Sequence, residues 1–372
     1  MRIGVDARNL IHNITGIGRY VLEMCHILAN KGHEIFLYIP QAPQVQLPCL
    51  PKTTLKTGNS TNAFSRIYWG QFLLTKLVKE DNIDIFWGPA HRLPFHLSKS
   101  RPTVVTIHDL VWREMPETMH FGTWLNERLF MKHALRTADY IVTVSDATRH
   151  SLCRYYPFCK DKSRTIHSGT NSLIKNSSIP LSSILPFNTS YFLFVGTLEP
   201  RKNLIRLLEA YARLQPSLRE NLFFVIAGGQ GWKLDNLKQK IRELNIETQV
   251  YLTGYISDDE LITLYQGARF LAMPSLLEGF GFPILEAHSL GIPVLTSNKS
   301  SMPEIAGDAG LLVDPLNITS ISEGLCQLAE NNELRASLQQ KTKANAERFS
   351  WDRAAHELAT LFEQALQNYK TK

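Results

Sequence analysis

The chain of 372 residues is too long for one ordinary hydrophobic core, and its length predicts two domains. A composition of 44% hydrophobic and 20% charged residues is that of a globular protein and excludes a disordered or fibrous one. No apolar run approaches the roughly 20 residues that a membrane span needs. Arg2, Asp6 and Arg8 lie where an export signal would be apolar, so we expect a cytoplasmic protein.

Charge is divided unevenly along the chain. The net charge of +6 is the balance of +9 over residues 1–185 and −3 over residues 186–372. A basic half predicts an anionic substrate or surface. Nucleic acid is disfavoured, because the sequence has no Lys/Arg-rich block and no recognisable nucleic-acid module. The alternative is a solvated basic face with no specific partner.

The first half alternates strands and helices. A helical pattern covers residues 18–31, and apolar runs predict strands at 2–7, 34–39, 83–88, 103–108 and 140–145. Continuous apolar runs are typical of strands covered on both faces, and their alternation with helices predicts a parallel sheet.

The second half repeats this pattern. Strands are predicted at 191–196, 222–228, 249–254, 268–274 and 292–297, with helices at 203–214 and 233–244. The Ser-, Asn- and Pro-rich stretch 171–190 predicts a linker, and 349–366 predicts a terminal helix with Ser350 as its N-cap. We therefore expect domains at 1–170 and 191–348, joined by the linker 171–190 and followed by a C-terminal segment 349–372.

Two glutamates flank a glycine loop and a helix start in SLLEGFGFPILEAHSLGIPV, residues 275–294. Glycines let backbone N–H groups approach a ligand, and the helix after Pro283 offers unpaired donors, so the stretch predicts a diphosphate site. Glu286 can accept hydrogen bonds from two ribose hydroxyls, and Glu278 from hydroxyls of a sugar. The alternative is an exposed loop charge at Glu278 and an ordinary helix acid at Glu286.

A basic pair follows a predicted strand in GTLEPRKNL, residues 196–204. Arg201 could bind diphosphate oxygens with two parallel hydrogen bonds, and Lys202 could add a point charge. A surface basic pair near a helix start is the alternative, and the helix dipole disfavours it.

These two motifs together resemble the large retaining glycosyltransferase family of the GT-B fold, often called family 4. The chain is most similar to bacterial mannosyltransferases of polysaccharide and lipopolysaccharide assembly. The resemblance implies an α/β fold with two Rossmann-like domains whose parallel sheets face a central cleft. It extends to FSWDRAA, residues 349–355, which is similar to the family's C-terminal helix that crosses back onto the first domain.

The resemblance also implies roles for matching residues. Glu278 would contact the donor sugar and Glu286 the ribose, while Gly254 and Tyr255 would border the base. The full set implied to bind the donor is Gly16, Gly18, Gly196, Arg201, Lys202, Gly254, Tyr255, Glu278, Phe280, Gly281, Phe282, Ile284 and Glu286. The set implied to serve catalysis is His108, Arg201, Lys202 and Glu278.

Two further matches lie in the first half. NITGIGRYV, residues 13–21, is similar to the family's glycine loop, in which Gly16 and Gly18 permit close approach of donor and acceptor. TVVTIHDLVWREMPE, residues 103–117, places His108 at a strand end, where it would hydrogen-bond the donor sugar, and Asp109 beside it. Taken alone, His108 is more simply a packing or capping histidine.

The acceptor site has no sharp motif. Asp109, Trp124 and Arg128 are the candidate acceptor contacts, and the basic, aromatic stretch 121–136 could rest on an anionic membrane surface at the inner face of the cytoplasmic membrane. The alternative is a surface helix whose apolar face is turned inward.

The expected reaction uses no metal or cofactor, with a nucleotide-sugar, GDP-mannose favoured, as a substrate. The acceptor would be lipid-linked or an oligosaccharide, the resemblance implies retention of configuration, and the domains would close around the donor. Two alternatives remain open: a UDP-sugar-dependent transferase of the same fold and a non-catalytic nucleotide-sugar-binding subunit. A nucleotide-sugar 2-epimerase is disfavoured, because it would need acid/base carboxylates and histidines in the cleft, whereas this chain carries the paired glutamates Glu278 and Glu286.

Overall fold

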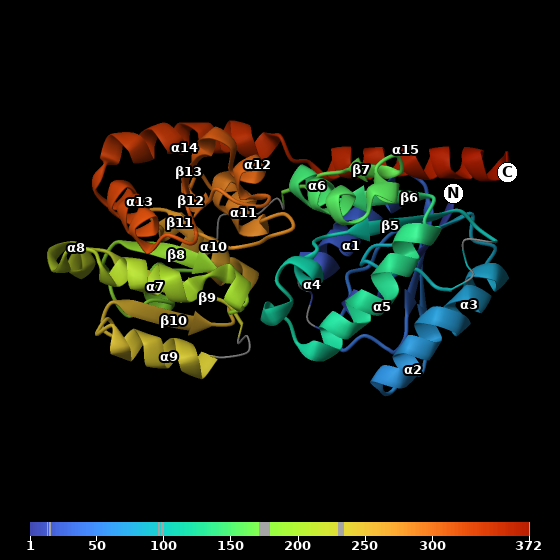
Figure 1. Ribbon diagram of the computed structural model, residues 1–372, viewed down its shortest axis with the longest axis horizontal. Helices are drawn as coiled ribbons and strands as arrows, with labels where there is room; N and C mark the ends of the chain where they lie inside the picture. The colour runs from blue at the N-terminus through green and yellow to red at the C-terminus, as the bar shows by residue number, and fades with distance from the viewer. Residues whose placement is uncertain are drawn as a thin grey trace. The chain divides into compact units, whose positions relative to one another are not determined.

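The computed structural model describes residues 1–12, 14, 16–95, 97, 100–170, 179–229 and 234–371. It divides into two compact units, shown in Figure 1. Unit 1 comprises Met1–Gly169 and Ser350–Lys372, and unit 2 comprises Thr170–Phe349. Residues 171–178 of the predicted linker lie outside the described residues.

Unit 1 is built on a seven-stranded parallel sheet of order β3-β2-β1-β4-β5-β6-β7. Its strands are β1 Arg2–Asp6, β2 Glu34–Ile39, β3 Thr53–Thr57, β4 Ile85–Gly88, β5 Thr103–Ile107, β6 Tyr140–Thr143 and β7 Ser163–Thr165. Its α-helices are α1 Gly16–Asn30, α2 Ala63–Tyr68, α3 Leu74–Glu80, α4 Val111–Glu114, α5 Phe121–Thr137, α6 Asp146–Tyr155 and α15 Trp351–Lys370. A π-helical turn, Trp69–Leu73, joins α2 to α3, and 3-10 turns lie at Arg8–Leu10, Pro116–Thr118 and Pro157–Cys159.

Helices cover both faces of this sheet. On one face, Trp87 of β4 packs edge-on against Tyr20 of α1 and lies against Phe362 of α15. On the other face, α3, α5 and α6 bury a second apolar cluster against alternate strand residues such as Phe86 and Val105. The C-terminal helix therefore belongs to the core of unit 1, with Ser350 accepting a hydrogen bond from the amide of Arg353 as its N-cap.

Unit 2 is built on a six-stranded parallel sheet of order β10-β9-β8-β11-β12-β13. Its strands are β8 Tyr191–Val195, β9 Phe223–Ala227, β10 Val250–Gly254, β11 Leu271–Met273, β12 Val294–Ser297 and β13 Gly310–Val313. Its α-helices are α7 Leu204–Ala212, α8 Pro216–Asn221, α9 Leu234–Glu243, α10 Asp258–Gly267, α11 Phe282–Ser289, α12 Met302–Ala306, α13 Ile318–Glu330 and α14 Asn332–Glu347. Its 3-10 turns are Leu181–Ser183, Pro200–Lys202 and Gly307–Ala309.

The core of unit 2 lies mainly between the sheet and α7, α9 and α13. Phe192 of β8 stacks on Phe224 of β9 and Phe270 before β11, with ring centroids 4.3 and 5.3 Å apart. Stacked rings across neighbouring strands hold the parallel strands in register. The carboxyl ends of these strands, and the loops that follow them, are thereby fixed in position.

The predicted parallel sheets and crossover helices are confirmed, but the sequence prediction missed three strands. These are β3 and β7 at the two edges of the first sheet and β13 at an edge of the second. Edge strands are short and partly exposed, so they lack the continuous apolar run of a central strand; TTLKT of β3 is an example.

The predicted glycine loop at 13–21 was also wrong in its bounds. Residues 13 and 15 lie outside the described residues, but Gly16 and Gly18 form the first turn of α1. Gly18 is buried, and a Cβ there would lie 3.2 Å from the carbonyl oxygen of Asn9, so this glycine serves helix packing.

Among the helices that the structure describes, none combines the length and the apolar character required to cross a membrane.

Candidate active site

In unit 2, three glycines follow neighbouring strands of the sheet. Gly196, Gly228 and Gly254 lie at the carboxyl ends of β8, β9 and β10, and the amide of Gly228 donates to the carbonyl of Gly254. A Cβ on Gly228 would lie 2.0 Å from the carbonyl oxygen of Gly196, so the two backbones meet too closely for any side chain. Ligands of open parallel sheets bind at this edge.

The predicted basic pair lies in a tight turn after β8. Pro200–Lys202 form a 3-10 turn, and Asn203 ends it in the left-handed region with φ of 63°. The buried side-chain amide of Asn203 donates through Nδ2 to the carbonyls of Pro274 and Pro315, at 2.9 and 2.7 Å. The turn that carries Arg201 and Lys202 is therefore anchored to the ends of two other strands, a role for Asn203 that the sequence prediction missed.

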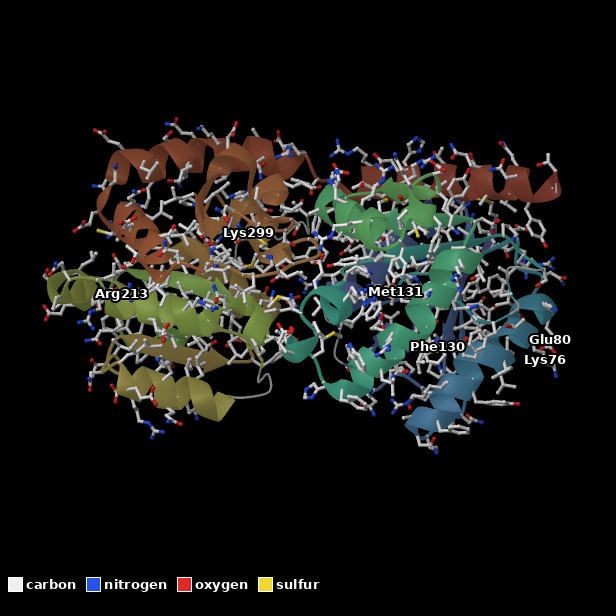
Figure 2. All side chains as sticks on the ribbon, in the orientation of Figure 1. Lys76, Glu80, Phe130, Met131, Arg213 and Lys299 are labelled. Carbon is white, nitrogen blue, oxygen red and sulfur yellow. The ribbon has the colours of Figure 1, made fainter. Side chains whose placement is uncertain are left out.

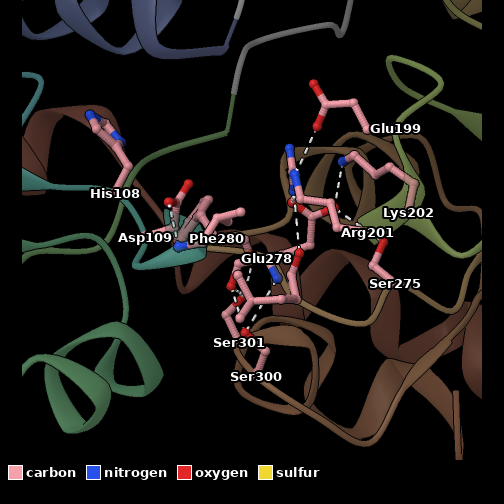
Figure 3. A network of polar contacts seen from close by, with 12 residues as sticks. His108, Asp109, Glu199, Arg201, Lys202, Ser275, Glu278, Phe280, Ser300 and Ser301 are labelled. Atoms are coloured by element: carbon pink, nitrogen blue, oxygen red, sulfur yellow. Dashed lines mark hydrogen bonds and ion pairs between the residues drawn. The ribbon is translucent and has the colours of Figure 1, made fainter. Parts of the chain in front are cut away.

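Glu278 lies between the two basic side chains (Figure 3). Arg201 donates to its Oε2 at 2.7 Å, and Lys202 pairs with its Oε1. The hydroxyl of Ser275 also donates to Oε1 at 3.1 Å. The structure thus brings together three of the four residues predicted to serve catalysis.

Burial and charge act on Glu278 in opposite directions. Burial by itself would raise the pKa of this carboxyl, but the positive charges of Arg201 and Lys202 hold its pKa at about 2. The carboxylate is therefore ionised at neutral pH and fixes both cations. Glu199, which is more exposed, accepts a hydrogen bond from Nε of Arg201 at 2.8 Å.

The loop after Glu278 is held by two serines. The hydroxyls of Ser300 and Ser301 donate to the carbonyl of Glu278, and that of Ser301 also donates to the carbonyl of Phe280. Gly281 has φ of 108°, a conformation that favours glycine, and it directly precedes α11. The loop therefore delivers the start of α11 to the same strand edge as the basic pair.

The other predicted donor contacts of unit 2 lie around this loop. Phe280 and Ile284 are buried, and the ring centroids of Phe280 and Phe282 lie 5.1 Å apart. Glu286 is buried in α11, where the hydroxyl of Tyr265 donates to its Oε2 at 2.9 Å. Tyr255 is 79% exposed beyond β10. Tyr265 was missed by the sequence prediction, because a tyrosine in a helix carries no local signal of a partner 21 residues away.

In unit 1, His108 lies directly after β5 and is buried. Its Nε2 lies 2.7 Å from the carbonyl oxygen of Pro89, which only accepts, so Nε2 carries the proton. Burial lowers the pKa of His108 to about 3. The imidazole is therefore neutral at physiological pH, with Nδ1 as a hydrogen-bond acceptor.

A partly buried polar cluster supports His108, and the sequence prediction missed it. His91 Nδ1 lies 3.0 Å from Glu127, and Arg92 donates to the same carboxylate at 3.2 Å. Burial would raise the pKa of Glu127, but His91 and Arg92 lower it to about 2. Only Glu127 of this cluster lies in the stretch 121–136 that the sequence analysis singled out.

The candidate acceptor contacts make two separate interactions, one at Asp109 and one between Trp124 and Arg128. Asp109 accepts a hydrogen bond from the amide of Val111 at the start of α4. On α5, the Arg128 guanidinium lies over the Trp124 ring, 5.1 Å from its centroid.

Comparison with known proteins identifies the family of this chain. The family model described as "Glycosyl transferases group 1" matches residues 182–345, and the family model "Glycosyltransferase Family 4" matches residues 14–172. The O-antigen chain mannosyltransferase B of Escherichia coli is 31% identical over 379 residues, covering 95% of this chain and 97% of that protein. The chain belongs to the family 4 glycosyltransferases.

Similar solved structures show which fold this glycosyltransferase has. Sucrose-phosphate synthase from Thermosynechococcus elongatus matches with a TM-score of 0.81 and 17% identity, over 99% of this chain and 100% of that one. HepE of Anabaena, in complex with UDP and glucose, matches with a TM-score of 0.77 and 18% identity, over 98% and 100%. The glycosyltransferase has the GT-B fold, with one Rossmann-like sheet in each unit.

We predict that Glu278→Gln destabilises the glycosyltransferase by about 3–5 kcal/mol at pH 7, because it leaves two cations without their buried counter-ion. The native pKa of about 2 lies below an unfolded value of about 4.3, so the carboxylate stabilises the fold above about pH 4.3. That stabilisation is lost as the pH falls toward 2.

Urea unfolding of both proteins at pH 7 and pH 3 measures this difference. The more exposed pair of Glu199 and Arg201 is the control, since Glu199→Gln should cost no more than about 1 kcal/mol. If the difference in the free energy of unfolding between wild type and Glu278→Gln stayed constant from pH 7 to pH 3, the assigned ion pairs would be contradicted.

Proposed function

We propose that this glycosyltransferase moves mannose from GDP-mannose to a lipid-linked or oligosaccharide acceptor in cell-surface polysaccharide synthesis. The observation that carries the proposal is the similarity to the E. coli O-antigen chain mannosyltransferase B over nearly the whole of both chains. HepE, solved with UDP and glucose, supports the alternative of a UDP-sugar donor, but at 18% identity it speaks for the fold alone.

In this proposal the donor diphosphate binds at the carboxyl ends of β8 and β11, against Arg201 and Lys202. The two cations share Glu278, and Arg201 also pairs with the more exposed Glu199. The N–H groups at the start of α11 add a positive dipole end. The backbones of Gly196, Phe280, Gly281, Phe282 and Ile284 would line this site. Glu199 competes for Arg201, so Glu199→Gln should bind nucleoside diphosphates at least as tightly as the native protein.

The two polyol ends of the donor would meet carboxylates. Tyr265 holds the carboxylate of Glu286, which would accept hydrogen bonds from ribose hydroxyls. Glu278 would accept from a hydroxyl of the sugar in addition to its bonds with Arg201 and Lys202. Gly254 and Tyr255 would border the base.

His108 would contact the sugar as a neutral acceptor. Its Nε2 proton is committed to Pro89 and its pKa is about 3, so Nδ1 suits a sugar hydroxyl donor rather than an anionic phosphate. The reaction would proceed with retention, and Arg201 and Lys202 would offset charge on the leaving diphosphate without a cofactor. Asp109 would orient the acceptor.

Titration calorimetry with GDP, UDP and ADP, followed by sugar transfer from GDP-mannose, tests this assignment. We expect GDP to bind best and Glu286→Ala to weaken it about tenfold, because about one net hydrogen bond is lost. Glu333→Ala, which removes a glutamate from the first turn of α14, is the control and should bind GDP normally. A preference for UDP would discard mannose, and binding of no nucleotide would contradict the transferase assignment.

We also propose that unit 1 meets an anionic membrane through a surface on α2, α3 and α5. This surface has two segments: the first runs from α2 through the π-helical turn Trp69–Leu73 into α3, and the second is α5. Exposed apolar side chains recur every four residues on both segments. They are Phe64, Tyr68 and Phe72 on the first segment, and Phe121, Leu125 and Leu129 on α5. The Phe95 ring lies between Phe72 and Phe130, with centroids 6.1 and 6.0 Å apart, and thereby joins the two segments. Figure 2 shows Phe130 on α5 and Lys76 on α3.

The positive charge of this surface favours an anionic partner. The exposed basic residues of α3 and α5 are Lys76, Lys79, Arg128, Lys132 and Arg136. Of the two acids in these helices, Glu80 pairs with Lys76 at 3.7 Å, and Glu127 is paired inside unit 1. Apolar side chains flanked by an excess of cations over acids are the pattern of a helix lying in an anionic interface.

Co-sedimentation with vesicles tests this surface. Binding to vesicles of phosphatidylglycerol and phosphatidylcholine should exceed binding to phosphatidylcholine alone at least tenfold, and it should fall with salt. Leu125→Ser/Leu129→Ser should lose binding, whereas Leu316→Ser, an exposed leucine of unit 2, should retain it. If the double variant instead converts a dimer into a monomer by light scattering, the surface joins two copies of the chain and the membrane proposal fails.

A further inference from the structure

The turn that follows β4 has a strained backbone at His91. This buried residue has φ of 62°, in the left-handed region that residues other than glycine seldom adopt. Its amide donates to the carbonyl of Thr106 in β5 at 3.0 Å, which helps to hold the turn. Backbone strain of this kind persists where the surrounding structure fixes it, and it concentrates at functional sites.

The same turn supports His108 at two points. The carbonyl of Pro89 accepts from Nε2 of His108, and Nε2 of His91 accepts from the backbone amide of His108 at 2.9 Å. Since an amide can only donate, Nε2 of His91 must be unprotonated. The second bond therefore requires a neutral His91 with its proton on Nδ1.

Glu127 supplies the partner for that proton. Its carboxylate lies 3.0 Å from Nδ1 of His91 and accepts from Arg92 through its other oxygen. Glu127 belongs to α5, so the pair ties the turn to a helix that is remote from it in sequence. A carboxylate behind a histidine fixes the tautomer and the ring orientation.

We propose that His91 and Glu127 are positioning residues for His108. Glu127 keeps the proton of His91 on Nδ1, and His91 then holds the His108 backbone so that Nδ1 of His108 accepts from the donor. This inference rests on the proposed contact between His108 and the donor sugar. His91 and Glu127 touch neither substrate; they act through His108.

Protonation of His91 would break this arrangement, because an N–H at Nε2 would face the amide N–H of His108. Burial opposes that protonation, but the charge of Glu127 raises the pKa of His91, with Asp109 adding to the effect and Arg92 opposing it. His108, whose ring centroid lies 5.7 Å away, is neutral. Turnover should therefore fall at acidic pH as His91 gains its second proton.

Nitrogen-15 NMR of the full chain tests the positioning role without reference to catalysis. In the native protein we expect ring-nitrogen shifts of an Nδ1–H tautomer for His91 and an Nε2–H tautomer for His108. In Glu127→Gln, His91 should lose this single tautomer, and the amide signal of His108 should move. Unchanged signals from a folded variant would overturn the proposal.

Kinetics test the consequence for transfer. Glu127→Gln should lower kcat about tenfold to a hundredfold, the loss that is typical when a residue that orients a metal-bound histidine is removed. Its affinity for GDP should not change, since the proposed nucleotide site lies in unit 2. The acid limb of its pH profile should move to lower pH, because loss of the Glu127 charge lowers the pKa of His91. An acid limb at the native pH would contradict the proposal.

Arg92→Gln is the matched control. It removes a partner of Glu127 but leaves the contacts among Glu127, His91 and His108 in place, so it should keep the native His91 tautomer and most of the turnover. Equal losses in both variants would mean that the cluster only stabilises the fold. If the native protein transfers no sugar but the NMR signature holds, the proposed function fails while the positioning of His108 stands.

Discussion

The buried carboxylate of Glu278 is the interaction on which the arrangement of unit 2 depends. A buried charge is tolerated only with partners, and Glu278 has two cations and a serine hydroxyl. These bonds join the turn after β8 to the loop before α11, and the Arg201–Glu278 bond spans 77 residues of the chain. Because the same bonds orient Arg201 and Lys202, the fold and the proposed diphosphate site share one constraint.

Unit 1 uses the same physical device with a different result. Glu127 is a largely buried carboxylate that also has two nitrogen partners, His91 and Arg92, and it also joins segments that are remote in sequence. In unit 2 the cluster presents cations, which suit a phosphate. In unit 1 it fixes a neutral imidazole, which suits a sugar hydroxyl. In each unit, a carboxylate with two nitrogen partners thus fixes the side chains that are proposed to bind the donor.

The sequence predicted what is local. The spacing of Glu278 and Glu286 and the Arg201–Lys202 pair are contiguous motifs, and the central strands are continuous apolar runs. The Glu127–His91 contact, the Tyr265–Glu286 contact and the anchoring by Asn203 escaped prediction, because each joins segments that only the fold brings together. The sequence also pointed to Glu278 as a sugar contact and gave no sign of its ion pairs, since side-chain direction in a glycine loop has no periodicity.

The most direct test of the account is the preference for GDP over GMP, measured by calorimetry for the native protein and for Arg201→Gln. If Arg201 and Lys202 bind the second phosphate, the native protein should prefer GDP at least about tenfold, as expected for one charge-assisted hydrogen bond. Arg201→Gln should lose most of that preference while its affinity for GMP changes little. An undiminished preference in a folded Arg201→Gln protein would contradict the placement of the diphosphate at this cluster.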